Sequence, residues 1–223
     1  MSDNQNNLRP AGEVNLSAPE SEYPEKEAPV ARPIDKVMAR RWSPRVFDER
    51  PVEREKMLTL LEAARWAPSC FNEQPWRFLV FDGSNPESLE RARACLAEGN
   101  AWALKAPVLL ISVARDNFAR NEKLNRTAQH DVGLATENLL LQAVELQLAA
   151  HPMAGFSVER ARHEFNIPDG FTVLAMIAIG NPYRGNLEDL DEKIRAKELA
   201  PRERKPVGEI AFAGTWDAPY ERG

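Results

Sequence analysis

The stretch that decides the fold is AARWAPSCFNEQPWRFLVF, residues 63–81. It begins inside a helix-patterned run, PVEREKMLTLLEAARWAP, whose apolar residues recur at helical spacing: Met57, Leu60, Leu61 and Ala64. It ends in a strand-patterned run, WRFLVFD, and between the two lies a polar turn bracketed by Trp66 and Trp76. The stretch therefore predicts a helix, a tight turn and a strand in close succession.

Further segments on the carboxyl-terminal side also have the patterns of regular structure. We expect an amphipathic helix at 86–97, interior strands at 108–113 and 171–179, a long buried helix at 131–150 and a last strand at 206–216. The run VLLISV is apolar on both faces, which is typical of a strand inside a sheet. The long helix has only three charged residues, so it should be central or buried between two subunits. Strands alternate with helices and no repeat is present, which indicates an α/β or α+β fold.

Composition limits the class of protein and its partners. With 223 residues, 43% of them hydrophobic, the chain can bury one full core. The net charge of −5 argues against nucleic acid or an anionic membrane as a partner. No apolar run reaches the roughly 18–20 residues of a membrane helix, and MSDNQNNLRP lacks the regions of a signal peptide. We therefore expect a cytoplasmic protein that binds neither nucleic acid nor membrane.

Residues 1–34 differ from the rest of the chain. They hold six acidic residues, three basic residues and five of the 17 prolines, with little periodic apolar pattern. Such a segment has too little apolar surface to offset its ordering entropy. We expect an extension that is flexible or draped over the surface, or that wraps a partner subunit. An interaction module that uses this acidic tail is the least specific functional alternative.

Several kinds of chemistry lack their motifs. No glycines are spaced as GxGxxG or GxxxxGK[ST], so any bound nucleotide must have its phosphate held by side chains. No GxSxG elbow is present, which argues against a hydrolase. Cys70 and Cys95 lie in unlike contexts and predict no disulfide framework. No metal site is expected, because the three histidines lie far apart without a second ligand at metal spacing: His130, His151 and His163.

Two basic clusters are candidates for an anion site. In RWSPR, the side chains of Arg41, Ser43 and Arg45 alternate, so an extended backbone places all three on one side. Guanidinium pairs bidentately with phosphate oxygens and a serine adds a neutral donor, which makes this segment a phosphate clamp. The alternative is a solvated basic segment before a helix. The second cluster, RERKP at 202–206, is an ordinary charged loop when taken alone.

Six motifs appear in an order that points to a known family. They are RxSxRxF at 41–47, the 63–81 stretch, a long helix that begins DVGLAT, HPMAGF at 151–156, IAIGNP at 177–182 and RKPVGEI at 204–210. Over roughly residues 34–217 the chain resembles the FMN-dependent nitroreductase family. The resemblance implies a three-layer α+β fold with a central mixed or antiparallel sheet flanked by helices. It also implies a flavin-binding domain at 35–223, with a carboxyl-terminal extension, in an intertwined homodimer with FMN at the subunit interface.

The resemblance also implies which residues hold FMN. Arg41, Ser43 and Arg45 match the positions that contact the phosphate, the ribityl chain and the pyrimidine edge of the ring. The remaining matches are polar turn residues, a loop over one ring face and a late basic pair: Asn72 and Gln74; Pro152, Met153, Ala154 and Gly155; Arg204 and Lys205. A backbone N–H of that loop is expected to bond flavin N5, and a cation at Arg45 would raise the flavin potential. No catalytic side chain is assigned.

Other residues near these motifs have structural interpretations. Trp66, Phe71 and Trp76 are expected to pack in the core, since aromatic residues at the ends of elements usually do. Cys70 is expected to be a small buried filler, with a redox role as the alternative. His151 is expected to cap the end of the long helix, where imidazolium and the helix dipole agree; the alternative is a proton donor in the site.

The predicted function is an FMN oxidoreductase. Hydride would pass from NADH or NADPH through flavin N5 to an electron-poor small-molecule acceptor such as a nitroaromatic or a quinone. The sequence does not choose between the two nucleotides. The alternatives are a reductive dehalogenase or flavin-fragmenting enzyme with a substrate lid at 116–130, and a non-catalytic FMN-binding regulatory or storage protein.

Overall fold

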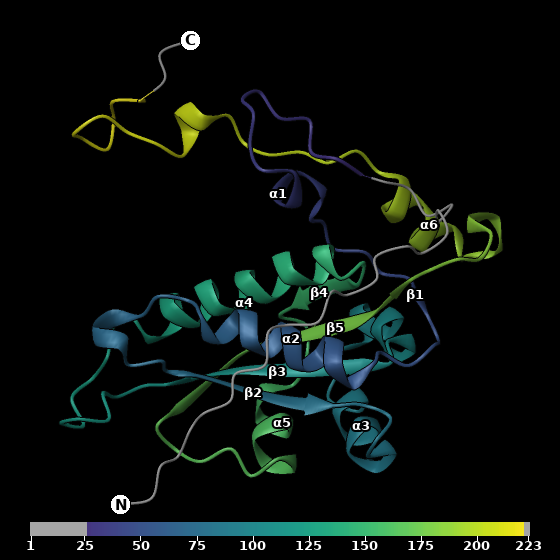
Figure 1. Ribbon diagram of the computed structural model, residues 1–223, viewed down its shortest axis with the longest axis horizontal. Coiled ribbons are helices and arrows are strands. Elements are labelled where there is room, and N and C mark those ends of the chain that lie inside the picture. Colours follow the sequence, from purple (N-terminus) through teal and green to yellow (C-terminus); the bar gives the residue numbers. More distant parts are fainter. Residues whose placement is uncertain (1–25, 221–223) are drawn as a thin grey trace, which may run out of the picture.

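A computed structural model describes residues 26–220, in which helices cover an antiparallel sheet (Figure 1). The strands of this range are β1 (Phe47–Asp48), β2 (Trp76–Phe81), β3 (Val108–Arg115), β4 (Ala149–Met153) and β5 (Phe171–Pro182). Their order is β1-β5-β3-β2, and β4 also pairs with β5. Every pairing between these strands is antiparallel, so of the two predicted sheet types the antiparallel one is confirmed.

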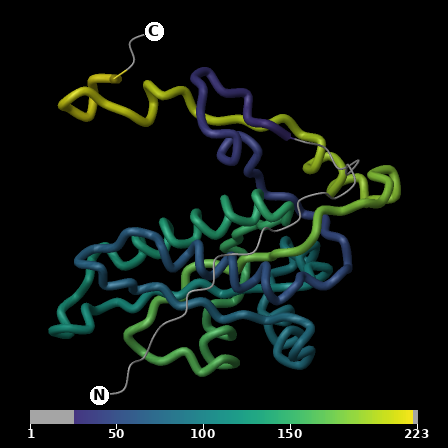
Figure 2. The backbone as a smooth tube through the Cα atoms, in the orientation of Figure 1, coloured from purple at the N-terminus to yellow at the C-terminus, as the bar shows by residue number. Residues whose placement is uncertain are grey.

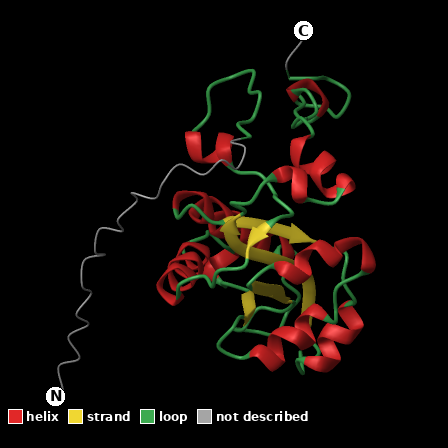
Figure 3. Ribbon diagram, turned by 90° about the vertical axis from the view of Figure 1, so that its right-hand side faces the viewer, coloured by secondary structure: helices red, strands yellow, loops and turns green. Residues whose placement is uncertain are grey.

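Helices lie on both faces of the sheet. The described α-helices are α1 (Lys36–Arg40), α2 (Arg54–Arg65), α3 (Pro86–Arg93), α4 (Ala128–Glu145), α5 (Val158–Glu164) and α6 (Glu192–Leu199). Short 3-10 helices are η1 (Cys70–Asn72), η2 (Glu98–Lys105), η3 (Leu187–Asp189) and η4 (Val207–Glu209). Helices α2 and α4 cover one face, whereas α3 and α5 lie against the other (Figures 1 and 3). The three-layer arrangement is therefore as predicted.

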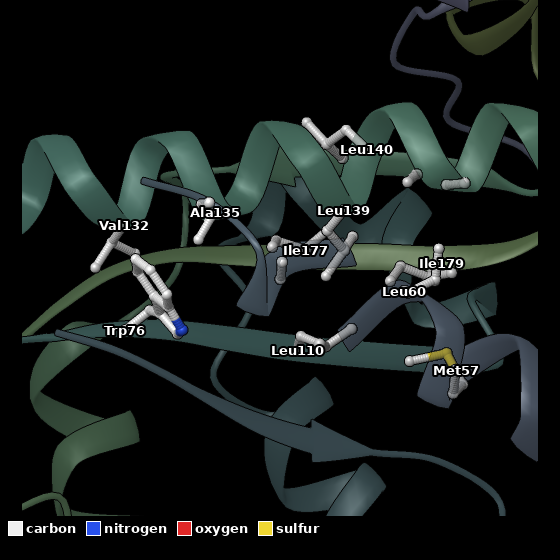
Figure 4. Packing of buried hydrophobic residues seen from close by; sticks show 14 of the residues in the cluster. Met57, Leu60, Trp76, Leu110, Val132, Ala135, Leu139, Leu140, Ile177 and Ile179 are labelled. Carbon is white, nitrogen blue, oxygen red and sulfur yellow. The ribbon is translucent and has the colours of Figure 1, made fainter. Parts of the chain in front are cut away.

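Two hydrophobic clusters, one on each face, fill the layers. On strand β3, Leu110 faces α2 and α4, whereas the neighbouring Leu109 and Ile111 face α3 and α5. This alternation follows from the two-residue repeat of a strand, and it explains why VLLISV is apolar throughout. Figure 4 shows Leu139 of α4 above Ile177 of β5 in the first cluster. The sheet is thus buried on both faces.

The long helix is shorter than predicted. Helix α4 ends at Glu145, and Ala149–Met153 form strand β4, where the sequence predicted helix to residue 150. The reversal occurs at Gln147, whose φ is +56°, while the Leu148 N–H donates to the Ala143 carbonyl. Pairing with β5 outweighs the helix propensity of the alanines. Helix α3 likewise ends at Arg93, before the predicted residue 97.

The predicted last strand at 206–216 is wrong. Within it the structure has the short helix η4, irregular backbone and one isolated β-bridge, from Phe212 to Pro219. Residues 183–220 run beside residues 26–41, away from the sheet, so no strand edge is available for pairing (Figures 1 and 2). We name these two ranges the carboxyl-terminal arm and the amino-terminal arm. Both carry exposed apolar side chains: Val30, Ile34, Met38, Val207, Ile210, Trp216 and Tyr220.

The predicted extension, residues 1–34, lies mostly outside the described residues; only 26–34 are described. At the first described residue, Lys26, the side-chain ammonium donates to the Glu198 carbonyl of α6 at 2.6 Å. This contact joins the two arms. In the described part of the chain, no helix is long and apolar enough to cross a membrane.

Candidate functional site

The predicted phosphate segment, residues 41–45, links α1 to β1. One guanidinium nitrogen of Arg41 donates to the Ser43 hydroxyl at 3.4 Å, so these two side chains lie together as predicted. The Arg41 Nε lies 3.7 Å from Glu137 Oε1 on α4. Arg41 and Arg45 are half-buried, which favours fixed geometry over a freely solvated segment.

The carboxyl-terminal arm holds the backbone of this segment. The buried Glu198 of α6 accepts a hydrogen bond from the Arg45 N–H through Oε1 at 2.9 Å. Arg202 donates to the carbonyls of Ala39 at 2.5 Å and Arg41 at 2.8 Å, and a third bond reaches Lys26 at 2.6 Å. Arg202 was expected only as part of the second basic cluster, without a contact of its own, and Glu198 was not singled out. Both residues lie in one charge-rich stretch of the sequence, and this was the indication that they could act together.

Positive charge is concentrated around residues 41–45. Burial lowers the pKa of Lys26, Glu198 opposes that shift, and Arg202 and Arg45 add to it. Burial also lowers the pKa of Arg202, and the nearby Arg41 and Arg204 lower it further. Neighbouring cations repel one another, so an anion bound among them would be stabilised. A phosphate dianion is such an anion.

Of the predicted late basic pair, Arg204 and Lys205, only Arg204 is described near this cluster. Arg204 is close enough to Arg202 to lower its pKa, while its guanidinium donates to the Glu203 carbonyl at 2.7 Å. Lys205 is exposed. Arg204 therefore lies near the candidate phosphate site, and its direct contact with phosphate stays a prediction, as does that of Lys205.

The polar turn, residues 69–74, has unusual backbone geometry. Phe71, Asn72 and Gln74 have positive φ values of +53°, +55° and +51°. Asparagine tolerates this region, but phenylalanine and glutamine seldom adopt it. Residues held in such conformations occur often at functional sites, where the surrounding structure compensates for their strain.

Side chains from inside and outside the turn hold it in place. Asp131, which is only 3% exposed at the start of α4, accepts the Cys70 N–H at 3.0 Å. Within the turn, the Ser69 hydroxyl accepts the Gln74 N–H at 3.0 Å, and the Gln74 amide donates to the Asn72 carbonyl at 3.2 Å. Asp131 was missed as a site residue; an acidic residue in an otherwise apolar helix was its signal.

Two of the three aromatic predictions at this turn are wrong. Trp76 is buried as expected, but Trp66 is 72% exposed and Phe71 is 74% exposed. The left-handed backbone at Phe71 accompanies this outward position, with the Phe118 ring 6.0 Å away, edge to face. The Arg120 guanidinium lies 4.3 Å from the Phe71 ring centre.

The predicted loop over the flavin is partly a strand. Pro152 and Met153 belong to β4, Met153 is buried, and Ala154 is exposed beyond the strand. The Gly155 carbonyl accepts two hydrogen bonds at 3.0 Å, from the Ala97 N–H and the Asn100 amide. A Cβ at Gly155 would lie 2.5 Å from that amide nitrogen, so any larger residue would force the Asn100 side chain to move. Among residues 26–220, no acceptor meets the N–H groups of Ala154 and Gly155.

His151 does not cap the long helix, because β4 carries it away from the end of α4. Its Nδ1 lies 2.9 Å from the Pro44 carbonyl, and its ring packs on Trp102 with centroids 4.4 Å apart. Burial lowers the pKa of His151 to about 4, and the cations Arg45 and Arg41 oppose protonation further. Near neutral pH the ring is therefore neutral, and Nδ1 must carry a proton to donate to the carbonyl.

The structure also describes the two cysteines and the groups that could bind a metal ion. Cys70 and Cys95 are both free thiols; Cys70 is half-buried and Cys95 is buried. Burial raises the pKa of the Cys95 thiol. Across the described range, no cluster of three or more histidine, cysteine or acidic residues could hold a metal ion. Neither thiol has a described feature that favours a redox role.

Two of the three predicted flavin segments meet within one chain. His151 connects the start of the 152–155 segment to the phosphate segment through Pro44. Between residues 26 and 220, by contrast, no hydrogen bond joins the polar turn to either of them. The turn is anchored to α4 instead. This division is compatible with a site built from two chains.

Comparisons with known proteins identify the fold family. Residues 38–181 match the profile of the Nitroreductase family. An uncharacterized 15.4 kDa protein of Mycolicibacterium smegmatis is 36% identical over 133 residues, which cover 60% of this chain and 87% of that protein. A Methanothermobacter thermautotrophicus protein, provisionally named an NADH dehydrogenase/NAD(P)H nitroreductase, is 31% identical over 147 residues, 64% of this chain and 73% of that protein.

Solved structures agree with the sequence comparison. The crystal structure of an oxidoreductase containing FMN is 37% identical and superposes with a TM-score of 0.79, covering 86% of this chain and 96% of that one. The family match spans more than half of the chain described here. The chain therefore belongs to the nitroreductase family, and the resemblance inferred from six short motifs is confirmed.

Proposed function

We propose that this protein binds FMN and is an NAD(P)H-dependent oxidoreductase. The observation that carries the proposal is the group of cations around the Arg41–Ser43 pair, to which Arg202 is joined by its hydrogen bond to the Arg41 carbonyl at 2.8 Å. A phosphate monoester fits this group because it brings two negative charges and several acceptor oxygens. Similarity to a solved oxidoreductase containing FMN supports the same cofactor.

Each segment of the candidate site has a defined task. Arg41 and Ser43 would bind the phosphate, and Arg45, Asn72 and Gln74 would contact the polar edge of the ring. The N–H groups of Ala154 and Gly155 supply donors for a ring nitrogen on the face that Pro152 and Met153 border. When bound, FMN would accept hydride from NADH or NADPH and return it to an electron-poor acceptor such as a nitroaromatic or a quinone.

We further propose a homodimer whose two chains complete each site. The polar turn is anchored to its own α4 and lies apart from the other two segments, so its ring contacts would be made to the cofactor of the second subunit. The exposed apolar residues of both arms, Trp216 and Ile210 among them, provide surface for that association. This assembly is the one the family resemblance implies.

The rival with a substrate lid has one observation in its favour. The predicted lid is 116–130, whose last three residues belong to α4. Its loop contacts the polar turn, because the Ala119 N–H donates to Glu73 Oε1 at 2.7 Å and Phe118 packs on Phe71. A substrate lid near the ring contacts would suit a reductive dehalogenase or a flavin-fragmenting enzyme. Absence of turnover with nitroaromatics and quinones, in protein whose FMN is bleached by NAD(P)H, would favour that rival.

The first experiment is a visible absorption spectrum of the purified protein before and after anaerobic NADH or NADPH. Flavin bands that bleach support the oxidoreductase and identify the preferred nucleotide. Bound FMN that resists reduction by either nucleotide would favour a regulatory or storage protein. A colourless protein that does not take up added FMN would refute the proposed cofactor.

The clamp is tested by substitution. Arg41→Ala combined with Arg45→Ala should weaken FMN binding at least tenfold, because two charge-assisted contacts to the cofactor are lost. The control is Arg54→Ala combined with Lys105→Ala, which removes the same charge from exposed positions elsewhere. Equal FMN affinity of the two double variants, measured by fluorescence titration, would contradict the clamp.

A further inference from the structure

A continuous row of contacts connects the two flavin segments that meet within one chain. It begins at the Gly155 carbonyl, which accepts the Asn100 amide at 3.0 Å. The Asn100 Oδ1 in turn accepts the Trp102 indole N–H at 3.1 Å. The Trp102 ring packs on the His151 ring, and the His151 Nδ1 reaches the Pro44 carbonyl at 2.9 Å. Helix η2 thus supplies a bridge behind both segments.

The Gly155 end of this row is the better fixed. Its carbonyl has two donors, one from the Ala97 backbone and one from Asn100, so its direction is set by two elements at once. Added bulk at Gly155 would collide with the same Asn100 amide. The Gly155 carbonyl therefore accepts two hydrogen bonds, whereas its N–H group has no acceptor within residues 26–220.

The Pro44 end ties the row to the phosphate segment. A neutral His151 donates from Nδ1, and its pKa of about 4 keeps it neutral at ordinary pH. Trp102 also stacks on Phe47 of β1 with ring centroids 6.3 Å apart. A displacement of η2 would therefore disturb both the 152–155 segment and the phosphate segment.

We propose that Asn100 is a positioning residue for the flavin ring. By holding the Gly155 carbonyl, Asn100 restricts the backbone torsions of Gly155, and these set the direction of its N–H, which would donate to N5 of bound FMN. Trp102 and His151 link this residue to the phosphate segment through the Pro44 carbonyl. An N–H at N5 favours the oxidised flavin, which accepts there, over the reduced flavin, whose N5 carries its own hydrogen. This inference rests on the proposed function.

The test is the midpoint potential of bound FMN in Asn100→Asp. Aspartate keeps the acceptor for Trp102 but cannot donate to the Gly155 carbonyl. We expect the ratio of affinities for oxidised and reduced FMN to fall about tenfold, which for a two-electron couple raises the potential by about 30 mV. Hydrogen exchange of the Ala97 N–H, the other donor to the Gly155 carbonyl, should also quicken in the FMN-free protein.

The matched control is Asn138→Asp. That amide likewise donates to a backbone carbonyl, that of Ala63, at 3.1 Å, but it joins α4 to α2. A second variant, Trp102→Phe, removes the indole donor to Asn100 and part of the ring that packs on His151 and Phe47, and it should raise the potential by a smaller amount. If Asn100→Asp does not fold, Trp102→Phe decides the question.

The outcomes separate the two proposals. A wild-type protein without FMN would overturn the proposed function. A wild-type protein that binds FMN, whose potential Asn100→Asp or Trp102→Phe shifts no more than Asn138→Asp does, would overturn the positioning role alone.

Discussion

The polar turn at 69–74 and the segment at 152–155 are two ring-side candidates that are held in opposite ways. The turn has three left-handed residues and depends on a buried carboxylate from α4. The segment continues a strand of the sheet and needs only one glycine at a close contact. A strained turn needs support from side chains elsewhere, whereas a strand extension inherits its position from the sheet. Substitutions in the two regions should therefore destabilise the protein for different reasons.

The largest effect is expected at the support of the turn. Asp131→Ala should lower the free energy of unfolding by about 2–3 kcal/mol, because the Cys70 N–H loses a charged acceptor. Urea unfolding measures the change. The control on the same helix, Glu137→Ala, removes a half-exposed carboxylate 3.7 Å from Arg41 and should cost less than about 1 kcal/mol. Equal costs for the two variants would contradict the assigned support.

At the segment, the expected defect is steric. Gly155→Ala should cost about 1–3 kcal/mol, because its Cβ would lie 2.5 Å from the Asn100 amide nitrogen. Gly83→Ala, where nothing lies within 4 Å of the added carbon, is the control and should be nearly neutral. Thermal unfolding compares the pair. In the combination with Asn100→Ala much of the loss should be recovered, and a strictly additive double variant would contradict the clash.

The segment should also be the more acid-sensitive region. Since the pKa of folded His151 is about 4, below the ordinary 6.5, the unfolded state binds more protons between these values. Stability should therefore fall as the pH drops from 6.5 towards 4, by up to about 1.4 kcal/mol per pH unit. Wild-type protein and His151→Gln, unfolded in urea at pH 7.5 and 5.5, should differ by about 1 kcal/mol in this loss. The exposed His163→Gln should behave as wild type does.

The smallest effect tests whether the turn is strained at a single residue. Gln74→Gly should remain within about 0.5 kcal/mol of wild type, because relief of its positive φ offsets the entropy of a new glycine. Gln142→Gly inside α4 should cost about 1 kcal/mol, since that backbone is already helical. A larger loss at Gln74 than at Gln142 would show that its side-chain bond to Asn72 outweighs the strain.

Local pattern was sufficient for most of the fold. The strands at 76–81 and 108–115 follow from short apolar runs, the second predicted at 108–113, and helix α2 follows from its helical repeat. Strand β4 did not, because Ala149 and Ala150 favour helix and only the partner strand β5 selects otherwise. The same limit explains the false strand at 206–216, whose apolar residues have no sheet edge beside them.

The same distinction between local patterns and long-range contacts applies to the candidate site. The proximity of Arg41 and Ser43 could be predicted because their spacing is short and their pairing is local. The contacts of Glu198, Arg202 and Asn100 could not, since each acts on a backbone group far away in sequence. Spacing of residues cannot encode such a contact, which exists only after the fold has formed.

The bonds from the carboxyl-terminal arm to the phosphate segment also impose an order in time. Glu198 follows Arg45 by 153 residues, and Arg202 follows Arg41 by 161. At roughly 5–20 residues per second, a ribosome needs about 10–30 s to make the second member of each pair after the first. The nascent chain therefore holds an arginine-rich segment without its buried carboxylate until Glu198 has been synthesised. The anion site can assemble only after that point.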